Sequence, residues 1–466
     1  MAKLDASLAE AENVYREMRQ LADTGDTEGK KKLVQLRSRY AMLMLDILQA
    51  RKVDDRMLSD PELAREFDSR FFHAPDAGQP PGQVAAAVDR GRHRRLHGLG
   101  PGPEPGAGRI LPLGAGQVHA ALTAWASRAE DRGRNDATMP RAIAGKMLHP
   151  VGLGCMNVSW AYGTPPSHDA CVALLQEAVD LGYNHFDTAR IYGAGKNEAL
   201  LAEALKGRRE QVFIASKTGI VVDGARRGVD CSPEYIAKDI DESLRLLATD
   251  HIELYYMHRF DPKVPVADSV GAMARAIEAG KIGAYGVSEW SSAHVREAHG
   301  VHPMAAVQTE YSLWTRNVEL GVLEACEELG IALVAFSPLG RGALCGVMRD
   351  PSILEEKDLR TRMPRFQPEN WARNLMLIEQ FVALARQAGV TPAQLALKWV
   401  LSRGANVHVI PGTTNPRHLA DNVQAAAIEV SEAVLDEADR LINHDTVAGH
   451  RYHDAILPTI DTEEFA

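Results

Sequence analysis

Four polar side chains between residues 187 and 258 form a set that can transfer a proton. They are Asp187, Tyr192, Lys217 and His258. A phenol, with a reference pKa of about 10, is a weak proton donor at neutral pH. A nearby ammonium stabilises the phenolate and lowers that pKa towards the working range. The carboxylate would anchor the lysine by a charge-assisted hydrogen bond, and the imidazole would position a substrate oxygen beside the phenol.

These four residues lie at or just after the ends of short apolar runs that are typical of strands. Asp187 and Tyr192 follow the second such run, Lys217 follows the third, and His258 ends the fourth. Taken singly, a strand-end aspartate often caps a loop, and an isolated lysine or tyrosine is usually a solvated surface group. Because barrel enzymes carry their chemistry at the C-terminal ends of successive strands, the set is predicted to converge on one mouth.

The sequence after Pro140 alternates short apolar runs with amphipathic stretches. The predicted strands are residues 151–155, 183–186, 212–216, 252–258, 282–287, 305–308, 332–336 and 407–410. The predicted helices include residues 169–181, 198–205, 233–247, 266–279, 318–329 and 392–401. This alternation predicts an α/β fold, a (β/α)₈ TIM barrel. A doubly wound sheet is the alternative, but no Gly-x-Gly-x-x-Gly follows the first strand.

Three parts are expected along the 466 residues. Residues 1–72 repeat apolar positions at steps of four and three, which predicts a helical hairpin-like extension whose stripes pack on each other or dimerise. Residues 73–138 are rich in Gly and Pro, so we expect a disordered linker. A shifted reading frame or an artificial start site would also explain this region. Residues 139–466 are expected to hold the barrel and a C-terminal tail.

The amino-acid composition limits the classes of partner that the protein is expected to bind. Apolar residues make up 45% and charged residues 24%, which is ordinary for a soluble globular protein. The net charge of −10 argues against nucleic acid as the main partner, and the basic run at residues 90–95 lacks interleaved aromatics. Five cysteines without paired short spacing suit a reducing compartment and predict no metal site. No apolar run is long enough for a membrane span, so we expect a cytoplasmic protein.

The stretch GYNHFDTARIYGAGKNEALLAEAL resembles the aldo-keto reductase signature, and SKTG, LYYMHR, GVSEW, VQTEYS and AFSPLGRG follow in that family's order. The chain is similar to the bacterial general reductases and the ion-channel β-subunit-like branch. The resemblance implies that the four residues above are the catalytic tetrad, with Tyr192 as general acid. It also implies NAD(P)H-dependent, reversible reduction of an aldehyde or ketone, with a small-molecule carbonyl or alcohol as substrate.

The same resemblance implies a cofactor site. It places the nicotinamide carboxamide near Ser288 and Gln308 and stacks the ring on Phe336, whose alternative role is a barrel-core side chain. The residues expected along the pyrophosphate are Ser337, Leu339 and Arg341. The residues expected at the adenosine end are Thr413, Thr414, His418, Asp421 and Asn422.

Two departures from the family pattern bear on the cofactor. Glu289 follows the serine where better-known members have Asn. Gly412 replaces a lysine that often holds the 2′-phosphate, and His418 fills an arginine position, although Arg417 lies beside it. Because members of this family usually use NADPH, we expect NADPH as the cofactor, with NADH as the alternative.

Four aromatic residues on the predicted loops are candidates for the substrate pocket. Trp160, Tyr162, Trp290 and Trp314 either form an apolar wall or pack against one another. The segment 341–371 and the tail 444–465 could both cover the site.

Two further interpretations stay open. A cofactor-sensing regulatory or binding subunit with little turnover is the alternative to an enzyme, although such a role would not need the phenol. The N-terminal extension could recruit a partner or drive homo-oligomer formation.

Overall fold

The computed structural model describes residues 141–223 and 226–465. The helical extension and the linker expected over residues 1–138 lie outside the described residues. Among those described, eight parallel strands form one sheet in the order β12-β11-β10-β9-β8-β5-β4-β3. These strands are β3 (Leu153–Gly154), β4 (His185–Asp187), β5 (Phe213–Thr218), β8 (Ile252–Met257), β9 (Ile282–Ser288), β10 (Ala306–Glu310), β11 (Ala332–Phe336) and β12 (Val407–Val409). All eight predicted strands are confirmed.

The two edges of this sheet meet and close a barrel. Val151 forms a parallel bridge with Val409, the amide of Gly152 donates to Val409 O at 2.8 Å, and the amide of Val409 donates to Pro150 O at 2.9 Å. Closure removes the unpaired strand edges that an open sheet would expose. The predicted TIM barrel is therefore confirmed.

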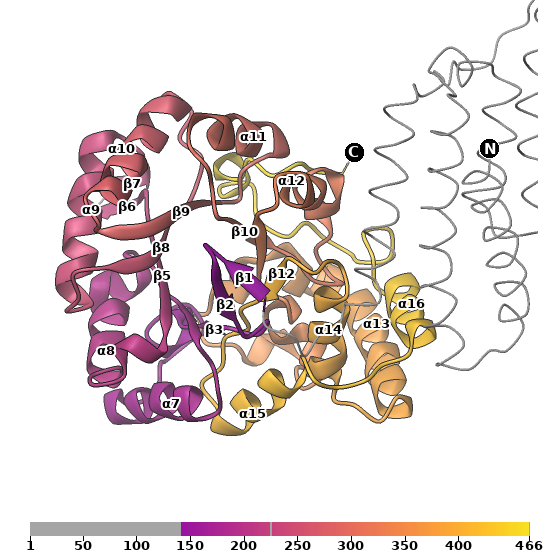
Figure 1. Ribbon diagram of the computed structural model, residues 1–466. Coiled ribbons are helices and arrows are strands. Elements are labelled where there is room, and N and C mark those ends of the chain that lie inside the picture. Colours follow the sequence, from indigo (N-terminus) through magenta and orange to yellow (C-terminus); the bar gives the residue numbers. More distant parts are fainter. Residues whose placement is uncertain (1–140, 224–225, 466) are drawn as a thin grey trace, which may run out of the picture. The chain divides into compact units, whose positions relative to one another are not determined.

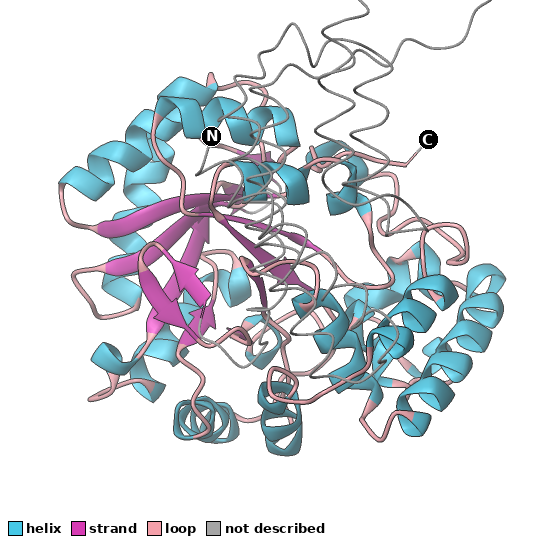
Figure 2. Ribbon diagram, turned by 45° about the vertical axis from the view of Figure 1, so that its right-hand side comes forward, coloured by secondary structure: helices cyan, strands magenta, loops and turns pink. Residues whose placement is uncertain are grey.

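Helices follow the strands and cover the outside of the barrel (Figures 1 and 2). They are α7 (His168–Asp180), α8 (Lys196–Ala204), α9 (Pro233–Leu246), α10 (Val266–Glu278), α11 (Ser292–Val301), α12 (Val322–Glu328), α13 (Pro368–Gln387), α14 (Pro392–Leu401), α15 (Pro416–Gln424) and α16 (Glu432–Leu441). The helix predicted over 318–329 begins only at Val322, because a 3-10 turn precedes Gly321. Several of these helices begin at a serine or threonine whose hydroxyl accepts an amide of the first turn, as at Ser232 and Thr391.

A short hairpin closes the N-terminal end of the barrel. Strands β1 (Arg141–Ile143) and β2 (Lys146–Leu148) lie at the centre of the strand ring in Figure 1. Ile143 and Leu148 pack with inward-facing strand residues such as Leu254 and Val334. The guanidinium of Arg141 donates to Gly404 O at 2.8 Å and to Leu401 O at 3.0 Å, near the start of β12. The hairpin leaves the opposite end, where the strands terminate, for the functional side chains.

A second hairpin extends from β5. It consists of β6 (Ile220–Asp223) and β7 (Arg226–Val229), paired antiparallel.

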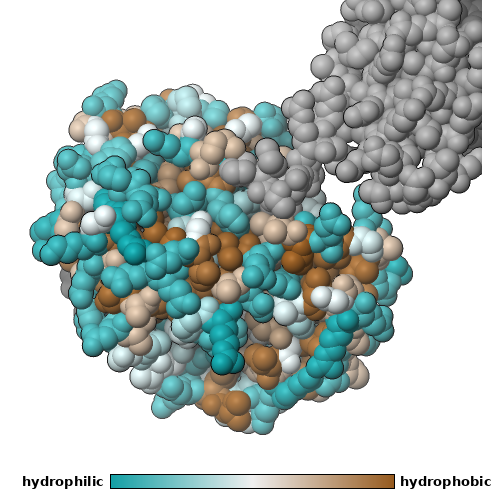
Figure 3. Space-filling view, turned by 60° about the horizontal axis from the view of Figure 1, so that its bottom comes forward, coloured by the Kyte–Doolittle hydropathy of each residue, from teal (hydrophilic) through white to brown (hydrophobic). Residues whose placement is uncertain are grey.

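The larger core layer lies between the strands and the helices. On the face in Figure 3, hydrophilic side chains cover the rim and apolar ones gather across the middle. No helix of the described residues is both long and apolar enough to cross a membrane.

We predict that Leu148→Ala lowers the free energy of unfolding by about 2–5 kcal/mol, because it opens a cavity in the barrel interior. Met147→Ala, at the neighbouring residue with 59% exposure, should change it by less than about 0.5 kcal/mol. Urea unfolding of both variants measures the difference. Equal losses in the two variants would mean that the hairpin does not seal the barrel.

Candidate active site

The structure brings the four predicted catalytic residues together at the C-terminal ends of three adjacent strands. Asp187 ends β4, Lys217 lies near the end of β5, and His258 follows β8. The amide of His258 donates to Thr218 O at 2.9 Å, which extends the strand pairing to the edge of the site. Tyr192 reaches the same place from the loop that follows β4.

The buried ammonium of Lys217 joins the set. Its Nζ donates to Asp187 Oδ1 at 2.5 Å and to Thr188 O at 2.7 Å, and it lies 3.4 Å from Tyr192 Oη. The second carboxylate oxygen of Asp187 accepts a hydrogen bond from Gln308 Nε2 at 2.7 Å. The side chain of Lys217 is fully buried, so its position is set by these partners and not by solvent.

A tight turn aims the tyrosine at the lysine. Gly193, Ala194 and Gly195 follow Tyr192 with φ of 59°, 55° and 88°, a run in the left-handed region that favours glycine. A Cβ at Gly195 would come within 2.6 Å of the Arg190 guanidinium, so that side chain would have to shift. The turn therefore depends on both backbone freedom and close packing.

The electrostatics differ in one respect from the sequence prediction. Burial raises the pKa of the Tyr192 hydroxyl above its ordinary value, and the Lys217 ammonium lowers it by less than burial raises it. The prediction that the net pKa falls towards neutrality is therefore wrong for this structure. Burial disfavours the charged phenolate more than one ammonium at 3.4 Å can offset. Tyr192 is a protonated donor throughout the neutral range.

Lys217 and His258 have opposite charge states. Burial lowers the pKa of Lys217, but Asp187 and Tyr192 together more than offset it, so the ammonium stays charged. Burial, aided by Arg259 and Lys217, lowers the pKa of His258 well below its ordinary value. The imidazole is consequently neutral, and its ring lies edge-on to Tyr192 at 6.0 Å between centroids. A neutral imidazole beside a phenol can exchange hydrogen bonds with a carbonyl oxygen.

Three residues expected at the nicotinamide lie on adjacent strands. Ser288 ends β9, Gln308 lies in β10, and Phe336 ends β11 with its ring partly exposed. The Ser288 hydroxyl is buried without a hydrogen-bond partner among the described residues. An orphaned buried hydroxyl beside a proton-transfer set fits a ligand with an amide group. The amide of Gln308, in contrast, is already bound to Asp187.

The segment expected along the pyrophosphate has an irregular backbone. Ser337 and Arg341 both have positive φ, at 50° and 56°, and Leu339 is buried. The guanidinium of Arg341 donates to Glu310 Oε2 at 2.8 Å and to Tyr452 Oη at 2.7 Å. Arg341 is thus held in an internal ion pair in this structure.

The residues expected at the adenosine end surround the start of α15. Thr413 Oγ1 accepts the amide of Asn415 at 3.0 Å, and Thr414 and His418 are exposed beside it. Asp421 is partly buried and Asn422 is buried on the same helix. A Cβ at position 412 would lie 2.9 Å from Gly154 O, so this strand end is open only to glycine.

The four candidate substrate aromatics occupy different environments. Trp160 is 47% exposed, and its ring lies 6.0 Å from that of Tyr192. Tyr162 lies under the guanidinium of Arg360. Trp290 is buried against Phe260, and Trp314 is buried near the rings of Phe366 and Trp371. Only Trp160 is both exposed and in ring contact with the tetrad. Trp290 and Trp314 are buried against aromatic side chains outside the four candidates, and the structure shows no ring contact among the four.

Glu289 forms an anchor that sequence reasoning missed. Its buried carboxylate accepts hydrogen bonds from Arg451 Nη1 at 2.9 Å, Thr462 Oγ1 at 3.0 Å and the Glu310 amide at 2.8 Å. Burial raises the pKa of Glu289, but Arg451 and its other donors more than offset this, so the pKa lies below 4.5. The pair therefore stabilises the fold above this pH, and the contribution is lost as pH falls through the lower folded value.

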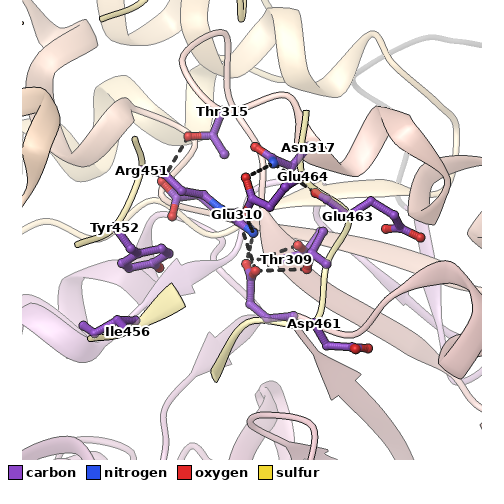
Figure 4. Close-up of polar contacts among 12 residues, drawn as sticks. Thr309, Glu310, Thr315, Asn317, Arg451, Tyr452, Ile456, Asp461, Glu463 and Glu464 are labelled. Carbon is purple, nitrogen blue, oxygen red and sulfur yellow. Dashed lines mark hydrogen bonds and ion pairs between the residues drawn. The ribbon is translucent and has the colours of Figure 1, made fainter. Parts of the chain in front are cut away.

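The rest of the tail continues this attachment (Figure 4). Arg451 Nη2 also donates to Glu464 at 3.0 Å, and Asn317 Nδ2 donates to Glu464 at 2.8 Å. Asp461 accepts the amide of Ser291 at 2.7 Å, where α11 begins. These contacts attach the tail to residues that follow β9 and β10, and their partners lie too far apart in sequence for any local pattern to reveal. That the tail covers the site stays a prediction.

Comparisons with known proteins agree with this geometry. The model described as "Aldo/keto reductase family" matches residues 150–443. A protein of Glycine max named "Probable aldo-keto reductase 1" is 40% identical over 308 residues, which are 66% of this chain and 89% of that protein. This chain belongs to the aldo/keto reductase family. As a member, it is an oxidoreductase that uses a nicotinamide cofactor to reduce aldehydes or ketones.

Solved aldo-keto reductases share the fold. The glycerol dehydrogenase of Gluconobacter oxydans superposes with a TM-score of 0.60 at 26% identity, covering 71% of this chain and 98% of that one. An aldo-keto reductase of Klebsiella pneumoniae in complex with NADPH gives 0.52 at 25% identity, covering 66% and 95%. Among residues 141–223 and 226–465, no group of three or more His, Cys, Asp and Glu could hold a metal ion.

We predict that Arg451→Met lowers the free energy of unfolding by about 3–5 kcal/mol, because it leaves the buried carboxylate of Glu289 without its cation. Arg440→Met is the matched control, since Arg440 pairs with Glu437 at the surface with 71% exposure, and it should cost less than about 1 kcal/mol. Denaturant unfolding measures both. Losses of the same size would show that the tail is not anchored by this pair.

Proposed function

We propose that this aldo-keto reductase reduces a small aldehyde or ketone with NADPH and that Tyr192 donates the proton. The observation that carries the proposal is the buried Lys217 ammonium, which lies 2.5 Å from Asp187 and 3.4 Å from the Tyr192 hydroxyl. A fully buried ammonium has a high desolvation cost, so a fold that keeps it beside a phenol favours a chemical role for that phenol.

The residues present fit a nicotinamide cofactor. The orphaned hydroxyl of Ser288 would bind the carboxamide, and Phe336 offers a partly exposed ring for stacking. At the start of α15, the exposed side chains of Thr414 and Arg417 would hold phosphate, next to Thr413. NADPH, when bound, supplies the hydride.

The chain's own residues handle the proton and the substrate oxygen. Tyr192 would donate its hydroxyl proton to the carbonyl oxygen, and Lys217 would stabilise the phenolate left behind. Neutral His258 would bind the same oxygen and fix its direction. The exposed ring of Trp160 would cover the substrate on one side. The reverse sequence, with phenolate as base, would oxidise an alcohol.

We predict that Tyr192→Phe lowers kcat/KM for carbonyl reduction by about 10²–10⁴-fold, because it removes the general acid. Cofactor affinity should stay nearly unchanged, which protein fluorescence titration would measure. Tyr285→Phe is the matched control, since its hydroxyl bonds to Ala298 O and His302 O on the outside of the barrel. A Tyr192→Phe enzyme that retains most of its turnover would refute the assignment of the proton donor.

We predict that Arg417→Gln weakens NADPH binding by about tenfold and leaves NADH binding unchanged. Arg417 is exposed in the first turn of α15, with no carboxylate of the described residues within 4.0 Å, and can meet a 2′-phosphate. Arg386→Gln, on the exposed end of α13, controls for the charge. Equal affinity of the unaltered protein for both cofactors would contradict the preference for NADPH.

A further inference from the structure

Arg259 is a cation beside the tetrad that the proposed chemistry does not use. It directly follows His258, and its Nη1 donates to the carbonyl oxygen of His258 at 2.7 Å. This is the one hydrogen bond that its guanidinium makes among the described residues, so most of its N–H donors remain available. The side chain is partly buried, which means that it reaches solvent at the edge of the site.

No carboxylate of the described part of the chain lies within 4.0 Å of this guanidinium. The nearest acid in sequence, Asp261, accepts the amides of Cys231 and Lys263, both at 3.0 Å. The acid of the tetrad, Asp187, is paired with Lys217.

The acids towards the tail are also engaged. Glu289 is paired with Arg451 at 2.9 Å, and Glu310 with Arg341 at 2.8 Å. Glu289 and Glu310 thus each have their own cation, and Arg259 has no carboxylate partner among the described residues.

The surroundings hold Arg259 in place. The amide of the preceding His258 is bonded to Thr218 O, and the ring of the following Phe260 stacks on His294 at 4.0 Å and meets Trp290 edge-on at 5.0 Å. Its charge acts on groups on both sides of the opening, since it lowers the pKa of Tyr192 and of Glu289. The neighbouring residues thus fix the backbone of Arg259 directly after His258 of the tetrad.

We propose that Arg259 is a specificity-determining residue that binds a carboxylate on the carbonyl substrate, so that oxo acids and carboxylate-bearing aldehydes are preferred over neutral carbonyl compounds. This inference rests on the proposed function of the same site. A guanidinium presents a planar fork of donors that matches a carboxylate, and partial burial strengthens the pair. Arg259 takes no part in the bond changes, which are hydride addition to the carbonyl carbon and proton transfer from Tyr192.

The test compares carboxylate substrates with neutral ones of the same shape. The probes are 2-, 3- and 4-carboxybenzaldehyde, each measured against its methyl ester with saturating NADPH. For at least one isomer, kcat/KM for the acid should exceed that for the ester by on the order of 10- to 100-fold, as expected for a charged hydrogen bond. In Arg259→Gln this ratio should fall towards one, and in Arg259→Lys it should stay intermediate. Arg275→Gln, an exposed arginine of α10, should keep the ratio of the unaltered enzyme.

Three results would count against a substrate-binding role of Arg259, each in a different way. Turnover of the esters with no preference for any acid would overturn the role of Arg259 and leave the proposed function standing. A preserved ratio in Arg259→Gln, with only a shifted pH profile, would show that the cation acts on Tyr192 and not on the substrate. Failure to reduce either member of every pair would overturn the proposed function and this inference together.

Discussion

The site depends on one buried ion pair, between Lys217 and Asp187. An ammonium without solvent contact is tolerated only when its donors are satisfied, and here Asp187, Thr188 and Tyr192 surround it. The pair fixes the distance between the cation and the phenol, and Gln308 holds the far oxygen of the carboxylate. Loss of either charge would leave the other uncompensated in the barrel interior, so the fold and the chemistry depend on the same contact.

The barrel supplies the rigidity that such a pair requires. Three neighbouring parallel strands present Asp187, Lys217 and His258 at one edge, and the β1–β2 hairpin fills the other end. The tail adds a second buried pair, Glu289 with Arg451, which ties the last residues of the chain to β9 beside Ser288. The two buried pairs hold the loops around the mouth, and Arg259, which directly follows His258, has no carboxylate partner among the described residues.

Much of this arrangement could be predicted from local sequence. The strands were recognisable because each is a short apolar run between turns, and the tetrad because its members follow those runs in order. The Glu289–Arg451 pair could not be predicted, because its partners are 162 residues apart and each residue alone is an ordinary charge. Likewise, residue types indicated that the Lys217 ammonium lowers the pKa of Tyr192. Only the packing shows that burial raises this pKa by more than the ammonium lowers it. The burial of Trp290 and Trp314 follows from partners on distant loops for the same reason.

The pH dependence of kcat/KM for reduction of a neutral aldehyde tests the central claim most directly. If a buried Tyr192 held beside Lys217 is the proton donor, the rate should stay constant through neutral pH. It should fall only above about pH 10, as the raised pKa of the phenol is passed. A profile that falls with an apparent pKa near neutrality would contradict the account, because a group other than this protonated phenol would then control the reaction.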